Sequence, residues 1–265
     1  MINWDVSPEI FSLGPIHVRW YGLLFAASFL IGFQIMHKIF IKENKSENDL
    51  NDLLWYMLAG TILGARLGHC LFYSPEYYLS NPLEILKVWK GGLASHGAAI
   101  GITIAIRMYS KKKIGQPFLW VYDRVVITVA LAGFFIRTGN LMNSEIIGIP
   151  TDVPWAFKFV RAYVTDPMTP RHPAQLYEAL SYLTIFIVLY FIYYKSYKKI
   201  KDGLIFGIFL VSVFTARFFI EFIKEDQSAF EAGMALNMGQ ILSIPLIIWG
   251  IYLILRKDIS NKVTT

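Results

Sequence analysis

The stretch that decides the fold is Arg137-Thr-Gly-Asn-Leu-Met-Asn-Ser-Glu-Ile-Ile-Gly148. It follows directly on an apolar run, residues 125–136, and leads into a loop that contains Pro150 and Pro154. A guanidinium, two side-chain amides and a carboxylate therefore stand where a membrane helix should be ending. Lipid does not solvate such groups, so they need partners within the protein or a function.

The rest of the composition indicates a membrane protein. Of the 265 residues 55% are hydrophobic and 17% charged, and the mean hydropathy is +0.46. The apolar residues occur in blocks of about 20, the length that crosses a bilayer core. We therefore predict an all-α integral membrane protein with about seven transmembrane helices. The predicted spans are 18–37, 52–73, 92–109, 117–136, 175–194, 204–223 and 237–255.

The distribution of lysine and arginine predicts the orientation of these spans. Fourteen basic residues flank one side of the membrane in four short segments, and eight are spread over longer segments on the other side. The positive-inside rule makes the short basic segments cytoplasmic, so the N-terminus is expected outside and the C-terminus inside. The first fifteen residues carry no base, so no cleavable signal peptide is expected.

This topology places residues 137–174 on the extracytoplasmic side, between spans four and five. The segment is rich in proline and aromatic residues, which is atypical of a disordered linker. We predict that residues 1–265 form a single polytopic membrane domain, with 137–174 as a small extracytoplasmic head or lid.

Ionisable residues inside the predicted spans are candidates for function. Arg217 and Glu221 share a helical face and can also be a purely structural ion pair. His96 lies in a glycine-rich stretch, where it can serve a site or simply accept a hydrogen bond. Gln175 and Glu178 face the same way, for which capping and packing is the alternative. The glycines at 60, 64 and 68 predict close helix packing.

Several familiar chemistries lack their sequence signals. The five histidines have no zinc-binding spacing, no serine-hydrolase elbow occurs, and no glycine pattern for nucleotides is present. The single cysteine, Cys70, excludes a disulfide framework and a thiolate metal cluster. We therefore expect no metal site and no cofactor.

Six blocks in order resemble the prolipoprotein diacylglyceryl transferase family, from about residue 8 to residue 255. The opening stretch is similar to the family signature, except that Ile136 stands where glycine is usual. Lys224 stands where the family often carries arginine. The remaining blocks are Leu13-Gly-Pro15 with Arg19-Trp-Tyr-Gly22, Gly91-Gly-Leu-Ala-Ser-His-Gly97, His172-Pro-Ala-Gln-Leu-Tyr-Glu178, Arg217-Phe-Phe-Ile-Glu-Phe222 and Met238-Gly-Gln-Ile-Leu-Ser243.

The resemblance implies an enzyme of the bacterial plasma (inner) membrane that acts at the outer leaflet. It would transfer the diacylglyceryl group of phosphatidylglycerol to the lipobox cysteine thiol of a preprolipoprotein and release glycerol phosphate, the first step of lipoprotein maturation. The expected partners are phosphatidylglycerol, the lipobox segment and the bilayer, with no nucleic acid.

Roles for individual residues follow from this implied reaction. Arginine binds phosphate oxygens in pairs, so Arg137 is expected to hold the lipid headgroup and Arg217 to act as a second clamp. His96 is the expected base for the thiol, with Tyr21 and Glu145 as the alternatives. Around Arg137, the expected lipid-binding residues are Asn140, Asn143, Glu145, Gly148 and Glu221, supported by Gln175 and Glu178.

Two rival functions make different predictions. A transporter or scramblase would be built from repeats, and no repeat is visible. A metal-dependent headgroup enzyme would use clustered aspartates, and the nearest such pair is Asp49 and Asp52, on the predicted cytoplasmic side.

Overall fold

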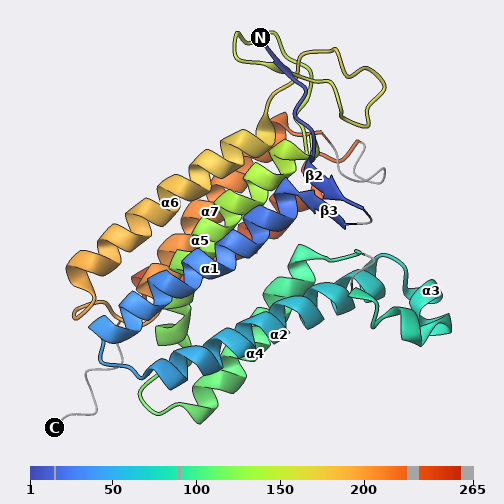
Figure 1. The fold of residues 1–265 in the computed structure, drawn as a ribbon. Coiled ribbons are helices and arrows are strands. Elements are labelled where there is room, and N and C mark those ends of the chain that lie inside the picture. The colour runs from blue at the N-terminus through green and yellow to red at the C-terminus, as the bar shows by residue number, and fades with distance from the viewer. Residues whose placement is uncertain (15, 89–90, 226–232, 258–265) are drawn as a thin grey trace. The chain divides into compact units, whose positions relative to one another are not determined.

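The computed structural model describes residues 1–14, 16–88, 91–225 and 233–257 (Figure 1). Four residues that the sequence predictions used lie outside these ranges: Pro15 of the first motif block, Lys90 and Lys262 of the basic residues counted for the topology, and Trp89 beside Lys90. The described chain is mostly helical, which confirms the all-α prediction. Its elements are β1 (Ile2–Trp4), β2 (Glu9–Leu13), β3 (Ile16–Arg19), α1 (Trp20–Lys42), α2 (Glu47–Phe72), α3 (Pro75–Ser80), η1 (Pro82–Glu84), α4 (Ser95–Lys112), α5 (Phe118–Met142), β4 (Phe157–Phe159), α6 (Ala174–Ser196), α7 (Leu204–Ile220), η3 (Glu221–Ile223) and α8 (Met238–Leu255).

Five segments in the described ranges are long and apolar enough to cross a membrane: α1, α5, α6, α7 continued by η3, and α8. They correspond to five of the seven predicted spans. The other two predicted spans are the helices α2 and α4, which carry more charge. Glu47, Asp49, Asp52 and Arg66 lie in α2, and Arg107, Lys111 and Lys112 in α4.

The chain divides into two compact units, and each is described by itself. Unit 2, residues 36–122, is built on the antiparallel pair α2 and α4 (Figure 1). Glycines at 60, 64 and 68 of α2 face Gly97, Gly101 and Ala105, and their backbones touch. The predicted glycine stripe is therefore the seam along which these two helices pack.

A buried arginine ties α2 to the segment that connects it to α4. Arg66 donates to the carbonyl oxygens of Glu84 (2.6 Å), Ile85 (2.9 Å) and Gly91 (2.6 Å). Three backbone acceptors thus satisfy the guanidinium of Arg66, so this charge serves the structure of unit 2.

Unit 1, residues 1–35 and 123–265, contains a helical bundle in which α5, α6 and α7 run side by side (Figure 1). At one end, the buried Asp123 accepts hydrogen bonds from the N–H groups of Gly203 (2.7 Å) and Phe206 (2.8 Å). These donors belong to the first turn of α7, so a carboxylate from α5 caps a helix that begins 80 residues later.

The segment that follows α5 folds over the opposite end of unit 1. Its core contains Leu141, Ile147, Phe157, Phe159 and Ala162, with Trp4 packed against them. The strand β1 pairs in parallel with β4, and Trp4 donates to the carbonyl of Leu141 (2.9 Å). The head that we predicted for residues 137–174 alone therefore includes the N-terminal strand as well.

Candidate functional site

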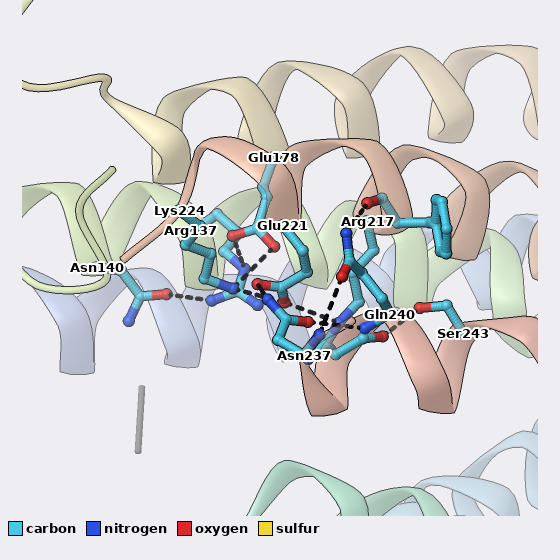
Figure 2. A network of polar contacts seen from close by, with 11 residues as sticks. Arg137, Asn140, Glu178, Arg217, Glu221, Lys224, Asn237, Gln240 and Ser243 are labelled. Carbon is cyan, nitrogen blue, oxygen red and sulfur yellow. Dashed lines mark hydrogen bonds and ion pairs between the residues drawn. The ribbon is translucent and has the colours of Figure 1, made fainter. Parts of the chain in front are cut away.

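The polar residues of the opening stretch belong to a cluster of charges at one end of unit 1. At this end α5 and α7 finish while α6 and α8 begin, because successive helices of the bundle are antiparallel (Figure 1). We call Arg137, Glu178, Arg217, Glu221 and Lys224 the cation cluster. Figure 2 shows them converging from α5, α6 and the end of α7.

Arg137 is held from two sides. Its Nε lies 2.9 Å from Oε2 of Glu178, and its Nη1 donates to Oδ1 of Asn140 at 3.1 Å. The Glu178 side chain is 1% exposed, so its charge needs this cation. The prediction for Glu178 allowed a capping role, but α6 has no side-chain cap and Glu178 is an ion-pair partner.

Lys224 lies between the two buried carboxylates of the cluster. Its Nζ is 3.0 Å from Glu221 and 3.8 Å from Glu178, and its side chain is 3% exposed. We expected that a lysine here would lose a bidentate contact of the family's arginine. Instead, the compact ammonium bridges two different carboxylates and joins α6 to the end of α7.

Arg217 completes the cluster through Glu221, at 3.4 Å from its Nε. Its side chain is 34% exposed, against 16% for Arg137 and 5% or less for the other three members. The cluster holds three cations and two carboxylates, a net single positive charge among these five described residues. A cluster of this composition suits a singly charged anion, and Arg217 is the arginine most open to one.

Asn140 connects Arg137 to Glu145, and Asn143 holds Glu145 from a second side. Asn140 donates to Glu145 at 2.7 Å, and Asn143 donates to the same oxygen at 3.1 Å. The turn that carries Glu145 contains Ser144 and Ile146 with φ of +53° and +60°. This left-handed conformation is strained for a β-branched residue such as Ile146, and strain of this kind is typical of functional sites.

Tyr21 and Gly148 reach the same end of unit 1. The ring of Tyr21 packs on Gly139, where an added Cβ would lie 2.8 Å from Tyr21 Cδ2. At Gly148 an added Cβ would lie 2.6 Å from both the Cβ of His172 and the carbonyl oxygen of Ile223. Gly148 thus lets three chain segments meet beside Lys224, with which it forms a β-bridge.

The N-terminus of α8 supports Glu221 from below the cluster in Figure 2. Asn237 and Gln240 form a capping box, and Asn237 Nδ2 donates to Glu221 at 3.5 Å. An added Cβ at Gly239 would overlap the carboxylate of Glu221. Only glycine at this position allows α8 to approach the carboxylate this closely.

His96 and Gln175 are the remaining predicted site residues. His96 belongs to unit 2, where it is exposed in the first turn of α4 beside the rings of Phe72 (5.2 Å) and Tyr73 (5.8 Å). Gln175 belongs to unit 1, in the first turn of α6, and is fully buried. The structure thus gathers every predicted site residue except His96 in unit 1.

The two aspartates considered for a metal-dependent enzyme are ion-paired with a lysine. Lys113 Nζ lies 2.6 Å from Asp49 and 2.6 Å from Asp52. The hydrogen bond from Lys113 lowers the pKa of Asp49. In the described part of the chain no group of three or more metal-ligating side chains is found.

Three members of the site were not assigned from the sequence: Lys224, Asn237 and Gln240. Lys224 follows Glu221 by three residues, a spacing that places two side chains on one face of a helical turn. That spacing was a usable signal. The contact between Asn237 and Glu221 has no local signal, because it depends on how α8 packs against α7.

Comparison with known proteins shows which family the whole chain resembles. The family model of prolipoprotein diacylglyceryl transferase matches residues 8–256. A protein from Chloroherpeton thalassium named phosphatidylglycerol–prolipoprotein diacylglyceryl transferase is 52% identical, over 97% of this chain and 94% of its own. Proteins of the same name from Tolumonas auensis and Bacteroides fragilis are 49% and 46% identical, over 96% and 95% of this chain and 97% and 93% of theirs.

These matches extend over nearly the whole chain and confirm the resemblance that the six motifs indicated. Together with the apolar helices, they identify a multi-pass membrane enzyme. The chain belongs to the prolipoprotein diacylglyceryl transferase family.

Proposed function

We propose that this protein transfers the diacylglyceryl group of phosphatidylglycerol to the cysteine thiol of a preprolipoprotein lipobox. Its relatives carry this activity in their name. The observation that carries the proposal is the cation cluster, which holds one net positive charge at one end of unit 1. The phosphodiester of phosphatidylglycerol carries one negative charge and is its electrostatic complement.

In the proposed reaction the thiol sulfur attacks the glyceryl carbon that bears the phosphate. The C–S bond forms while the bond between the glyceryl carbon and the phosphate ester oxygen breaks. Glycerol phosphate leaves with the electron pair of that C–O bond. Negative charge therefore grows on the phosphate in the transition state. Arg137 and Arg217 bind these oxygens and stabilise that charge, because they are preorganised cations in a poorly solvated site.

The other charged members of the cluster position the arginines. Glu178 fixes Arg137, and Glu221 fixes Arg217, while Lys224 prevents the two carboxylates from repelling each other. Asn140 links Glu145 to Arg137, and Asn143 holds Glu145 in place. Gly148 keeps the surrounding segments close enough for these contacts.

The proton of the thiol has to be accepted as sulfur becomes nucleophilic. His96 is the proposed base, since imidazole is the usual general base near neutral pH. Tyr21 and Glu145 are the alternatives. Both lie in unit 1 close to Arg137. No step of this scheme uses a metal or an organic cofactor.

We further propose the topology that the basic residues predict, with seven spans in one polytopic domain of the bacterial inner membrane. In it α2 and α4 cross the membrane as well as the five more apolar segments. The carbonyl partners of Arg66 and the glycine seam of α2 and α4 support this. The N-terminus, the head and the cation cluster then face outward, where a secreted lipobox segment arrives.

A direct assay tests the function. Purified protein in phosphatidylglycerol vesicles is incubated with a lipobox peptide, and the peptide is analysed by mass spectrometry. We expect the peptide to gain one diacylglyceryl group, and a cysteine-to-serine peptide to remain unmodified. Transfer from phosphatidylethanolamine at the same rate would contradict a site built for an anionic lipid, and no adduct from phosphatidylglycerol would refute the proposal.

A further inference from the structure

One buried side chain near the cation cluster has no partner in the described protein. Gln175 is 0% exposed, and neither its Oε1 nor its Nε2 makes a hydrogen bond with any described residue. A buried amide left in this way destabilises a protein, so nearly all such groups are hydrogen-bonded. The buried Gln116 follows this rule, with Tyr109 and Asp49 as partners.

Gln175 lies close to the cation cluster along α6. It precedes Glu178 by three residues on the buried face of the helix, which places it about 4.5 Å nearer the N-terminus of α6. The helices α5 and α6 are antiparallel, so the residues after Arg137 extend in the same direction. Two more buried atoms without a partner in the described chain occur there, Asn143 Oδ1 and Ser144 Oγ.

The helix directions place these atoms on the same side of Arg137, the arginine that we assign to phosphate. Gln175 offers one donor group and one acceptor, Ser144 offers a hydroxyl, and Asn143 offers an acceptor. Phosphate oxygens only accept hydrogen bonds and an ammonium only donates them. A hydroxyl does both, and because it is uncharged it needs no counter-ion among these three neutral side chains.

We propose that Gln175, with Asn143 and Ser144, forms a hydroxyl-binding subsite that recognises the glycerol headgroup of the anionic lipid. This rests on the proposed function and adds to it how the headgroup is selected. With the phosphate on Arg137, the headgroup hydroxyls extend toward Gln175 and satisfy its amide. A headgroup without hydroxyls leaves that amide unpaired, and sites of this kind discriminate strongly against such analogues.

The test compares two lipids of equal charge, phosphatidylglycerol and a phosphatidylpropanol whose headgroup has no free hydroxyl. Transfer to a lipobox peptide is measured for the wild type and for Gln175→Met, which keeps the side-chain length but removes the amide. We expect the wild type to prefer phosphatidylglycerol at least about a hundredfold in kcat/KM. In Q175M the preference falls below about tenfold, because activity on phosphatidylglycerol drops while activity on phosphatidylpropanol changes less than about threefold.

Thermal unfolding separates recognition from a structural role. Without added lipid, Q175M is expected to unfold at or above the wild-type Tm, since a buried unpaired amide has been removed. The matched variant Gln116→Met is expected to lower the Tm, because it removes two hydrogen bonds made by a buried glutamine. Should Q175M fail to fold, Gln175→Asn, which retracts the amide, provides the same comparison.

Each outcome decides the proposal. Equal losses on both lipids, or an unchanged preference, would overturn the hydroxyl subsite and leave the transferase function standing. If the wild type transfers nothing from phosphatidylglycerol, the proposed function fails, and lipid binding then tests the subsite. The rise in Tm that each lipid produces is measured for the wild type and for Q175M. A preference for phosphatidylglycerol that is present in the wild type and lost in Q175M supports the subsite, and a preference of the same size in both proteins refutes it.

Discussion

At the scale of single residues, the site depends on how buried charges are distributed. Glu178 is almost completely buried and binds both Arg137 and Lys224. A buried carboxylate of this kind is stable only while its cations remain, which fixes the arginine before any substrate arrives. The ion pairs of Glu178 therefore determine both the charge of the site and its rigidity.

Replacing Arg137 by lysine tests the guanidinium separately from the charge. R137K keeps the cation but replaces the planar guanidinium fork, which binds phosphate oxygens two at a time, by a single ammonium. We expect kcat/KM for transfer to fall by about 10²–10³-fold, the range for losing a preorganised donor. The control is Arg161→Lys, an exposed arginine paired with Asp5 in the head, which should stay within about twofold of the wild type.

Lys224 tests the charge of the cluster. Lys224→Met leaves two carboxylates against two arginines, so the site loses its net positive charge. We expect the KM for phosphatidylglycerol to rise about tenfold, and the Tm to fall, because Glu221 and Glu178 lose a shared cation. Lys224→Arg, which keeps the charge, should remain within about threefold. Wild-type KM in K224M would show that Lys224 has no influence on the lipid.

Gly239 tests the support of Glu221 by α8. A Cβ at Gly239 overlaps the Glu221 carboxylate and forces it away from Arg217 and Lys224. Gly239→Ala should therefore lower kcat/KM at least about tenfold, in line with overpacking of a close contact. Gly32→Ala in α1 is the control, since its Cβ would meet only Thr128, at an ordinary 3.5 Å. Equal activity of the two variants contradicts this role.

The sequence predicted much of this site because its residues lie in local motifs. Arg137, Asn140 and Glu145 fall within one turn and the loop that follows it, and they interact as neighbours. The partnership of Arg137 with Glu178 was not predictable from spacing, since 41 positions separate them. It depends on the antiparallel packing of α5 and α6, which periodicity does not specify.

At the scale of elements, the pair α2 and α4 illustrates a different source of stability. Gly64 and Gly97 bring the two backbones into contact, so dispersion between close helices replaces large side chains. The repeated spacing of small residues made this seam predictable. Charge distinguishes these two helices from the five more apolar segments, and the charge of Arg66 is met by carbonyl oxygens of the loop between them.

This seam is tested by Gly97→Ala. The added methyl group would overlap the backbone of Gly64, so the helices must separate. We expect the free energy of unfolding to fall by about 1–3 kcal/mol, which is measured as a lower Tm in detergent. Ala99→Leu, at an exposed position of the same helix, adds more volume and should leave the Tm unchanged. If both variants have wild-type Tm, the seam does not stabilise unit 2.

At the scale of the whole molecule, the orientation that we propose in the membrane rests on the placement of lysine and arginine. It can be tested with single cysteines, because Cys70 is the one cysteine in the sequence and Cys70→Ala gives a cysteine-free background. A cysteine at the exposed Thr165 should react with an impermeant maleimide in intact spheroplasts. A cysteine at the exposed Ser196 should react only after permeabilisation, and the reverse pattern would contradict the proposed topology.

In the function that we propose, the head and the cation cluster together form the active end of unit 1. The N-terminal strand β1 belongs to the head through its pairing with β4, which hydropathy could not indicate because paired residues such as Ile2 and Phe157 are 155 positions apart. Helix positions, by contrast, followed closely from the apolar blocks. The prediction thus succeeded where burial in lipid determines the pattern and failed where distant strands pair.

We propose that Arg137 and Arg217 together hold the phosphate of one anionic lipid. An experimental structure of the protein with bound phosphatidylglycerol measures the distances from the phosphate oxygens to both guanidinium groups. We expect hydrogen-bonding distances to both, with the headgroup hydroxyls on the side of Gln175. A phosphate bound outside the cation cluster, with both arginines still occupied by Glu178 and Glu221 alone, would contradict it.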